Sequence, residues 1–193
     1  PKKNTYFFLI SHQLSHLIPT IRSRCIKFKL EKPSFENFAK IINNNKEDII
    51  ESDINFLYDL SYGSPGLALE YYTEDIQNTF KSIVSIFKEK KSLSHDIIDL
   101  ANNQASQNND YFNSFLFIIK FILSNLIKIY SGVNIQEQFT SEVKNTFDDL
   151  KNYINLKKCI EIINYINQNQ KDLFIYNLDK KIFTLNLFSE ISN

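Results

Sequence analysis

The stretch Tyr111–Tyr130, YFNSFLFIIKFILSNLIKIY, is long and largely apolar, and it decides the expected fold. Its apolar side chains recur at helical spacing and cover almost every side of the helix that they would form. A helix that is apolar nearly all round is a buried one. Lys120, Asn125 and Lys128 interrupt the run, and such residues are costly inside a bilayer. The sequence therefore predicts a core helix of a folded domain rather than a membrane span.

Amphipathic helical patterns flank this central segment from residue 74 to the end of the chain. Gly132 is expected to end the central helix and Asn177 to cap the last one. The apolar spacing predicts the other helices over residues 76–87, 93–100, 141–169 and 182–191. The result is an all-helical block of about five helices over residues 74–193. Either this block is a self-sufficient core, or its surplus apolar surface packs against a partner.

Three short helices are predicted between residues 34 and 73. Ser34 is a good N-cap for a helix over residues 35–43, and Ser52 or Asp53 could cap a second helix over residues 54–61. The third helix follows the turn Gly63-Ser64-Pro65-Gly66, in which Gly63 suits a left-handed conformation, Ser64 a cap and Pro65 the first helical position. A bundle this small needs support from its neighbours. The runs Asn43–Asn45 and Asn102–Gln104 are expected to be solvated linkers.

Two strands are expected before this bundle. Residues 6–10, YFFLI, form a short apolar run that is typical of a buried strand, and the run ends at Ser11. Residues 25–30, CIKFKL, alternate apolar and basic side chains as a second strand would. Pro33 cannot extend the hydrogen-bonding ladder and closes this region.

Between the two strands lies the segment 19–25, PTIRSRC, which holds both arginines of a chain with 22 Lys and Arg residues in all. Lysine supplies positive charge everywhere else. Two arginines in one short segment therefore suggest a need for a planar guanidinium, which grips phosphate or carboxylate through several donors. The alternative is that Arg22 and Arg24 pair with nearby acids and have a purely structural role.

Composition limits the function classes further. The 22 basic residues are balanced by 22 acidic ones, so no global charge favours nucleic acid. A G-x-x-x-x-G-K-[ST] phosphate-binding loop is absent from the sequence. Two cysteines are too few for a disulfide framework, and reduced thiols in the cytoplasm are the simplest interpretation. His12 and His16 are four residues apart, but without further ligands the signal for a metal site is weak. The absence of methionine leads us to expect a piece of a longer protein or a processed one.

The three motifs FFLISHQ (residues 7–13), LIPTIRSRC (17–25) and GSPGLALE (63–70) together resemble the delta-prime family of bacterial DNA polymerase III clamp-loader subunits. The resemblance implies an AAA+ fold in which Ser23-Arg24-Cys25 is the Ser-Arg-Cys motif. Arg24 would be an arginine finger for ATP on a neighbouring subunit, with Ser23 and Cys25 as its supports. Ser11 would hold the sensor-1 place, and Gly63, Ser64, Pro65 and Gly66 would begin the third helix of the lid. The Walker motifs would lie upstream of Pro1.

One departure from the family pattern concerns Leu67. Nucleotide-binding relatives carry a sensor-2 Arg or Lys shortly after the turn, so Leu67 indicates a subunit that does not hydrolyse ATP. The expected architecture is mainly α: the edge of an AAA+ core over residues 1–33 with two strands, a three-helix lid over 34–73, and a helical collar over 74–193.

The function that the resemblance implies is a non-catalytic, cytoplasmic subunit that helps to load the sliding clamp onto DNA. Its partners would be the gamma/tau and delta subunits, and, through the complex, the clamp and primer-template DNA. The chain itself would bind no cofactor, whereas ATP and magnesium would be held by the neighbouring subunit. The alternatives are an ATP-hydrolysing subunit of the gamma/tau type and a purely helical interaction module.

Overall fold

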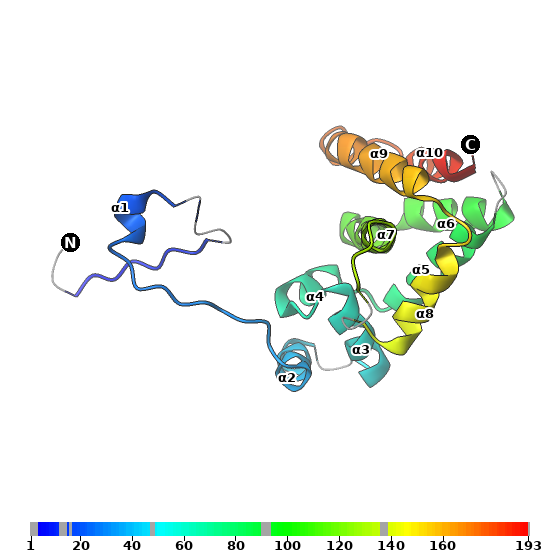
Figure 1. Cartoon of the computed structure of the whole chain (residues 1–193). Coiled ribbons are helices and arrows are strands. Elements are labelled where there is room, and N and C mark those ends of the chain that lie inside the picture. Colours follow the sequence, from blue (N-terminus) through cyan, green and yellow to red (C-terminus); the bar gives the residue numbers. More distant parts are fainter. Residues whose placement is uncertain are drawn as a thin grey trace. The chain divides into compact units, whose positions relative to one another are not determined.

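The computed structural model describes residues 4–11, 15, 17–46, 49–89, 94–135 and 139–192. The chain divides into two compact units, residues 1–31 and residues 32–193, which are considered separately (Figure 1). The first unit holds the arginine segment. The second contains nine of the ten helices found within the described residues. The division into a core edge, a lid and a collar stays a prediction, because the three expected domains are not resolved as separate units.

The N-terminal unit contains a single short helix within its described part, α1 (Pro19–Arg22). The two strands expected over residues 6–10 and 25–30 are not seen: both segments are extended but pair with no neighbour among the described residues. A strand completes its hydrogen bonds only against another strand. The apolar side chains that the two predicted strands would bury are exposed, among them Phe8 at 92% and Leu30 at 94%.

Three short helices follow, as the sequence predicts: α2 (Phe35–Asn45), α3 (Glu51–Leu60) and α4 (Pro65–Tyr71). Ser34 caps α2 by accepting a hydrogen bond from the amide of Asn37. The predicted cap of α3 is wrong, because α3 starts earlier, after Ile50, whose side chain makes no cap bond. Asp53 instead lies within α3 and accepts a hydrogen bond from Gln77 Nε2 at 2.7 Å, which links α3 to α5.

The next three helices are α5 (Ile76–Lys88), α6 (His95–Ser106) and α7 (Asn109–Tyr130). Ser94 and Asn108 cap α6 and α7 through side-chain oxygens. Asn102–Gln104 is not the solvated linker that its composition suggests: it forms part of α6, and Gln104 is buried. The run Asn43–Asn45 is likewise helical, as the end of α2. In both places the helix continues through amide side chains because its apolar face is packed against neighbouring helices.

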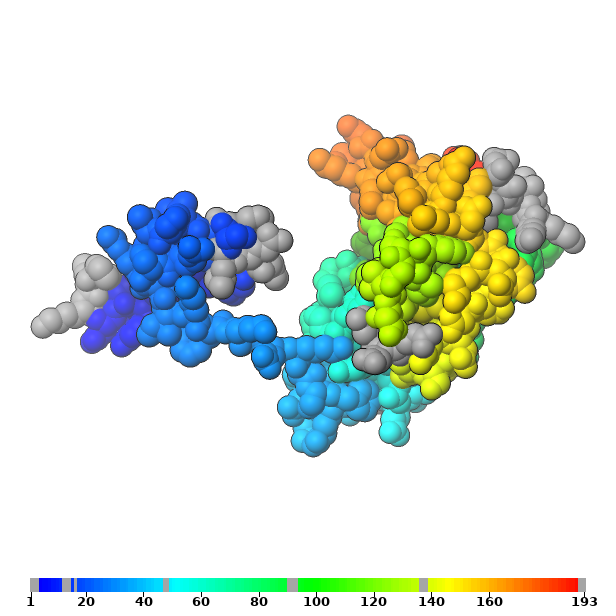
Figure 2. All heavy atoms as spheres, in the orientation of Figure 1, coloured from blue at the N-terminus to red at the C-terminus, as the bar shows by residue number. Residues whose placement is uncertain are grey.

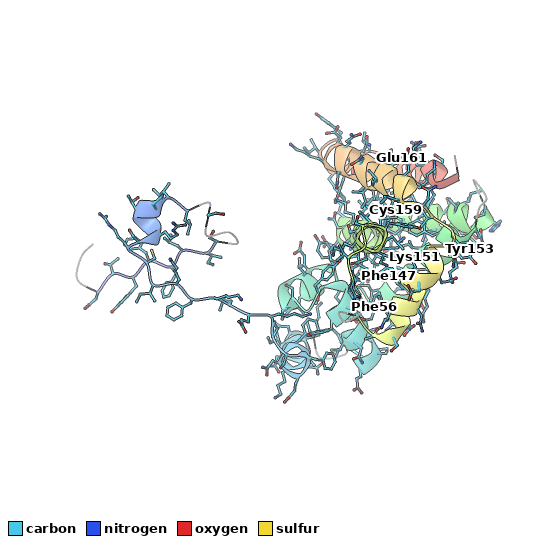
Figure 3. All side chains as sticks on the ribbon, viewed as in Figure 1. Phe56, Phe147, Lys151, Tyr153, Cys159 and Glu161 are labelled. Atoms are coloured by element: carbon cyan, nitrogen blue, oxygen red, sulfur yellow. The ribbon has the colours of Figure 1, made fainter. Side chains whose placement is uncertain are left out.

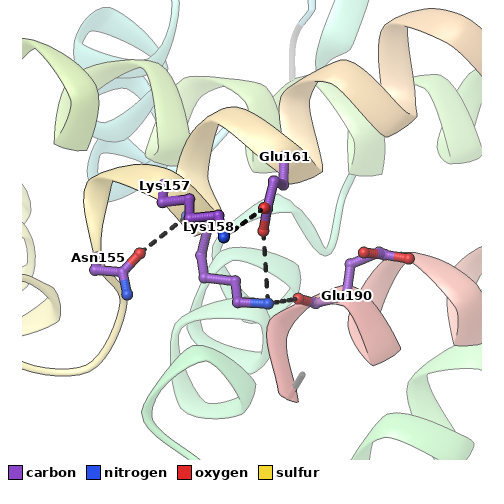
Figure 4. A network of polar contacts seen from close by, with 5 residues as sticks. All are labelled: Asn155, Lys157, Lys158, Glu161 and Glu190. Atoms are coloured by element: carbon purple, nitrogen blue, oxygen red, sulfur yellow. Dashed lines mark hydrogen bonds and ion pairs between the residues drawn. The ribbon is translucent and has the colours of Figure 1, made fainter.

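The single long helix expected over residues 141–169 is wrong. The structure has α8 (Ser141–Leu150), a tight turn, and α9 (Leu156–Ile175), followed by α10 (Lys180–Ser192), so the described part of residues 74–193 holds six helices rather than about five. Asn155 caps α9 by accepting from the amide of Lys158 at 2.9 Å (Figure 4). The cap of α10 is Asp179 rather than Asn177, since the Asp179 carboxylate accepts from the amides of the first turn.

Helix α7 runs through the middle of the helical unit and contacts α4, α5, α8 and α9 (Figure 1). One continuous core reaches from α2 to α10. The side chains of Phe147 and Cys159, labelled in Figure 3, are buried in it. α7 is the one described helix that is long and apolar enough to cross a membrane. Half of its 22 residues are buried among the other helices and nearly all the rest are partly buried, which confirms the prediction of a core helix.

Helices α9 and α10 are also joined by polar contacts of a charged side chain. Lys158 Nζ donates to the carbonyl oxygen of Glu190 at 2.9 Å and lies 3.5 Å from Glu161 Oε2 (Figure 4). The Lys158 side chain is only 20% exposed, so its ammonium needs these acceptors. This network fixes α10 against the first turns of α9.

Candidate functional site

The arginine segment is a single helical turn with defined ends. Pro19 occupies the first helical position, where its missing N–H costs nothing, and Ile18 before it is extended. The turn closes at Ser23, whose amide donates to the carbonyl of Pro19 at 2.9 Å. The Ser23 hydroxyl also donates to the carbonyl of Thr20 at 3.2 Å. Ser23 thereby terminates the helix and turns the chain just before Arg24.

Arg24 follows this turn, and its amide donates to the carbonyl of Ile21 at 3.1 Å. The residue is exposed, as is Arg22 at the end of α1. Within the described part of the chain, neither guanidinium forms an ion pair. A hydrogen-bonded turn that presents an exposed guanidinium can bind an anion supplied from outside the chain.

The remaining predicted residues of this unit flank the turn. Ser11 is exposed at the end of the first extended segment. Cys25 is a free, exposed thiol and not the strand residue that the sequence predicts. His12 and His16, considered as metal ligands, lie outside the described residues. Within the described residues, no group of three or more His, Cys, Asp or Glu side chains is placed to hold a metal ion.

The turn at residues 63–66 has the backbone that the sequence predicts. Gly63 has a positive φ of 70°, and its amide donates to the carbonyl of Tyr58 at 2.7 Å. Ser64 caps α4 by accepting from the amide of Leu67, and Pro65 is the first helical residue. Leu67, where nucleotide-binding relatives of the family would carry a basic residue nearby, is exposed on the first turn of α4.

Gly63 also makes room for a lysine that the sequence gives no reason to single out. A Cβ atom on Gly63 would collide with Lys32 Cε and would lie 2.9 Å from the Tyr58 ring. The Lys32 ammonium rests over this ring, 4.4 Å from its centroid. Such a cation–π contact contributes about 0.5–1 kcal/mol at an exposed site. Lys32 is the first residue of the helical unit, so this contact fixes the chain at the point where it enters that unit.

The same turn is joined to the central helix by Tyr62. This residue has a positive φ of 52°, which is unusual for a side chain of its size. Its hydroxyl accepts a hydrogen bond from Asn125 Nδ2 of α7 at 2.8 Å, and its ring packs against Phe121. The Lys128 ammonium lies 4.7 Å from the ring centroid. These contacts hold the strained residue in place and attach the turn to α7.

A buried carboxylate completes the set of contacts around the turn. Asp59 Oδ2 accepts from the amide of Thr140 at 2.9 Å and from its hydroxyl at 2.6 Å. Burial raises the pKa of Asp59, while the two Thr140 hydrogen bonds and the charge of Lys32 act in the opposite direction. Asp59 thus ties the end of α3 to the start of α8.

Sequence reasoning missed these supporting residues because their partners are distant in the chain. Asp59 and Thr140 are 81 residues apart, and Tyr62 and Asn125 are 63 apart. Neither pair has a spacing that a single sequence can identify. The only local signal was Gly63, which favours a positive φ and so predicts the turn. It does not predict which residues pack against the turn.

Two curated proteins are similar to the chain. The DNA polymerase III subunit delta′ of Buchnera aphidicola subsp. Baizongia pistaciae is 31% identical over 108 residues, which is 54% of the chain and 32% of that protein. The subunit of the same name from Buchnera aphidicola subsp. Schizaphis graminum is 35% identical over 100 residues, which is 51% of the chain and 28% of that protein. The resemblance to delta-prime subunits that the sequence indicates is confirmed.

These matches span about a third of the length of the curated relatives and about half of the chain. No protein-family model matches the chain. No solved structure matches it either.

Proposed function

We propose that this delta-prime-like chain acts in a DNA polymerase III clamp loader as a subunit that hydrolyses no ATP itself. It would supply Arg24 in trans to ATP on a neighbouring subunit. Its partners would be the gamma/tau and delta subunits, and the complex would place the sliding clamp on primer-template DNA in the cytoplasm. The similarity to two delta′ subunits supports the assignment to this complex.

The observation that carries the role of Arg24 is its exposed position directly after a closed turn. The backbone bonds of Ser23 and Arg24 fix where the guanidinium starts, and no described acid of the chain neutralises it. The chemistry would be electrostatic. As the γ-phosphoryl group transfers, negative charge grows on its oxygens, and a guanidinium stabilises that charge through several donors at once.

In this proposal the neighbouring subunit holds the ATP and its magnesium ion, and this chain contributes one cation and its supports. Ser23 would act by closing the turn, and Cys25 by continuing the chain away from it. Ser11 would stand at the sensor-1 position. The extended segments over residues 6–10 and 25–30 would become strands at the edge of an AAA+ sheet, whose other strands would pair with their backbones and whose packed helices would cover the apolar side chains that are now exposed.

The turn at Gly63, Ser64, Pro65 and Gly66 would begin the last helix of the lid, and the helices from α5 to α10 would form the collar. Surplus apolar surface supports such a collar. Ile175, Tyr176 and Ile182 are 57–68% exposed near the end of α9 and the start of α10. Apolar side chains gathered on a helical surface are typical of a surface that a partner covers.

The experiment compares two arginine variants in a clamp loader reconstituted with the natural full-length protein. Arg24→Ala is expected to leave assembly intact and to lower DNA-stimulated ATP hydrolysis at the neighbouring site by about a thousandfold or more. Arg24→Lys should recover little of this loss, because an ammonium lacks the planar set of donors.

Arg22→Ala is the matched control, since Arg22 is exposed in the same segment and should be dispensable for hydrolysis. Normal single-turnover hydrolysis with Arg24→Ala would refute the arginine-finger role. Equal losses with both variants would point instead to a general effect of positive charge in this segment. If the wild-type chain fails to co-elute with clamp-loader subunits, the chain is a helical module of another system.

A further inference from the structure

An open groove of about 400 Å³ lies on the helical unit between α7 and α9. Its lining includes Lys120, Gln170, Lys171, Phe174 and Ile175. Helix α9, shown in orange in Figure 2, forms part of the outer surface of this unit. Lys120 comes from the central helix α7, so it brings an amine from the core of the fold to a groove that small molecules in solution can enter.

Two amide side chains fix the position of the Lys120 nitrogen. Lys120 Nζ donates to Gln170 Oε1 at 2.6 Å, and Gln170 Nε2 in turn donates to Asn113 Oδ1 at 3.4 Å. The bond to Gln170 needs one N–H, which both the ammonium and the neutral amine possess. Loss of a proton therefore keeps this bond and gives the nitrogen a lone pair for reaction at the groove.

The surroundings of Lys120 favour that neutral form. The residue is only partly exposed, and burial lowers the pKa of its amine because the ammonium loses water that the protein does not fully replace. A larger fraction of the side chain is therefore the free amine at a given pH. Only the free amine can attack a carbonyl carbon, and partial desolvation is one of the ways in which proteins turn a lysine into a nucleophile.

The rest of the groove suits a particular class of reagent. Lys171 is exposed and lines the same groove, where its ammonium can bind a phosphate group. Phe174 is partly buried and Ile175 is 59% exposed, so apolar surface is available for a short carbon chain. An acyl phosphate combines the three matching features: an electrophilic carbonyl carbon, a phosphate and an apolar acyl chain.

We propose that Lys120 is a site of covalent acylation by small acyl phosphates that bind in the groove between α7 and α9. The lone pair of Lys120 Nζ attacks the carbonyl carbon, and a C–N bond forms as the bond from that carbon to the phosphate oxygen breaks. Phosphate leaves with the bonding electrons and takes up the proton that the nitrogen loses. The products are acyl-lysine and hydrogen phosphate, so no further reactant is needed. Lys171 stabilises the charge of the phosphate.

The product also fits the surroundings of Lys120. Acylation removes the positive charge, but the new amide keeps one N–H, which can still donate to Gln170 Oε1. The acyl group adds apolar atoms next to Phe174 and Ile175. Modification therefore relieves the partial burial of a charge without removing its hydrogen bond. This inference concerns the chain on its own and does not depend on the role of Arg24.

The first test measures the rate of acetylation of each lysine when the natural full-length protein is incubated with acetyl phosphate. Quantitative peptide mass spectrometry is expected to find Lys120 acetylated at least fivefold faster than Lys81, an exposed lysine of α5 that serves as the internal control. A rate at Lys120 no higher than that at Lys81 would overturn the proposal.

The second test asks whether the groove recognises the phosphate. Lys171→Gln should lower the rate of acetylation of Lys120 by acetyl phosphate at least threefold, because it removes the cation that binds the phosphate. The same variant should leave the rate unchanged with the N-hydroxysuccinimide ester of acetic acid, which is uncharged. Lys157→Gln is the matched control: it removes a lysine of α9 whose side chain is 83% exposed and which does not line the groove.

Thermal unfolding of each variant shows whether the fold is kept, and Lys171 is exposed, so its replacement should not disturb the core. If a folded Lys171→Gln variant reacts with acetyl phosphate as fast as wild type, the groove does not bind the phosphate and the proposal fails. Equal losses of rate with both acetylating reagents would also refute it, because the variant would then have changed Lys120 itself.

Discussion

Replacing Asp59 tests whether the helices around the Gly63 turn are held together as the structure indicates. Asp59 is 2% exposed, and its two hydrogen bonds from Thr140 connect α3 to α8. A hydrogen bond to a charged group contributes about 1.5–3 kcal/mol. Asp59→Ala removes both bonds but also relieves the burial of a carboxylate, and Thr140 is exposed enough for water to replace the lost acceptor. We expect a net loss of about 2 kcal/mol in the free energy of unfolding.

Thr140→Val separates the two bonds. It removes the hydroxyl donor at 2.6 Å and keeps the amide donor at 2.9 Å, so it should cost about half as much. The Thr140 side chain makes no bond that caps α8, so the loss of a cap does not complicate the comparison. Urea unfolding followed by circular dichroism gives each free energy, and the double variant gives the coupling between the two residues.

The pH dependence supplies an independent check. The pKa of Asp59 is raised in the folded state by burial, from an ordinary value of 3.8. The folded state therefore binds the proton more tightly than the unfolded state does. The contribution of this group to stability is largest at low pH and falls as the pH rises from about 3.8 through the raised pKa. Asp59→Asn abolishes this titration, so the stability of wild type relative to that variant should decrease as the pH rises from 3.8 through the raised pKa.

Two results would refute this reasoning. One is an Asp59→Ala variant that unfolds within about 0.3 kcal/mol of wild type, which is near the error of such comparisons. The other is a free energy of unfolding of wild type that increases relative to that of Asp59→Asn as the pH rises. That result would mean that burial does not dominate the pKa of Asp59.

Two further predictions concern the turn at Gly63 and the two cysteines. Gly63→Ala should cost about 2 kcal/mol in urea unfolding, from its left-handed backbone and the displacement of Lys32 from the Tyr58 ring; Gly66→Ala, where a Cβ meets no atom within 4 Å, should change stability by less than about 0.5 kcal/mol. Iodoacetamide should modify exposed Cys25 in the native protein and spare Cys159, because burial raises the pKa of Cys159 to about 12 and suppresses its thiolate. Mass spectrometry should find both cysteines modified only after unfolding. Equal rates of modification of the two cysteines in the native protein would contradict the burial of Cys159.

Helices with strong apolar periodicity and a clear start signal could be predicted from the sequence. Ser34 and Ser64 cap α2 and α4 as expected, because a cap is formed by residues within one turn of each other. The break between α8 and α9 could not be predicted from periodicity, since apolar residues continue through it. The Tyr130 hydroxyl lies 2.9 Å from the carbonyl oxygen of Lys151 and 2.6 Å from that of Ile154, so its single proton can be donated to either of two acceptors at the break. This is a contact from another helix.

The candidate site also has one part that could be predicted from the sequence and one part that could not. The Ser23 turn is local, and the hydrogen bond of the Ser23 hydroxyl to a nearby carbonyl is the kind of support that the motif suggested. Whether Arg24 acts in trans stays a prediction, because it depends on a neighbour. No local pattern in the sequence singles out Lys32 or Lys120. The environment of Lys32 depends on the space at Gly63, and that of Lys120 on a hydrogen bond to the amide of Gln170, which lies 50 residues away.

The strands over residues 6–10 and 25–30 are the largest difference between expectation and structure, and their side chains explain it. Ile26, Phe28 and Leu30 alternate with Lys27 and Lys29, which is the pattern of a strand with one buried face. Yet these three apolar residues are 85–94% exposed. Burying each of these side chains would contribute roughly 1.5–3 kcal/mol. An extended segment without a neighbour cannot bury them and does not gain this free energy. The alternation therefore has the pattern of a strand, but within the described residues no strand pairs with this segment and no layer covers its apolar side chains.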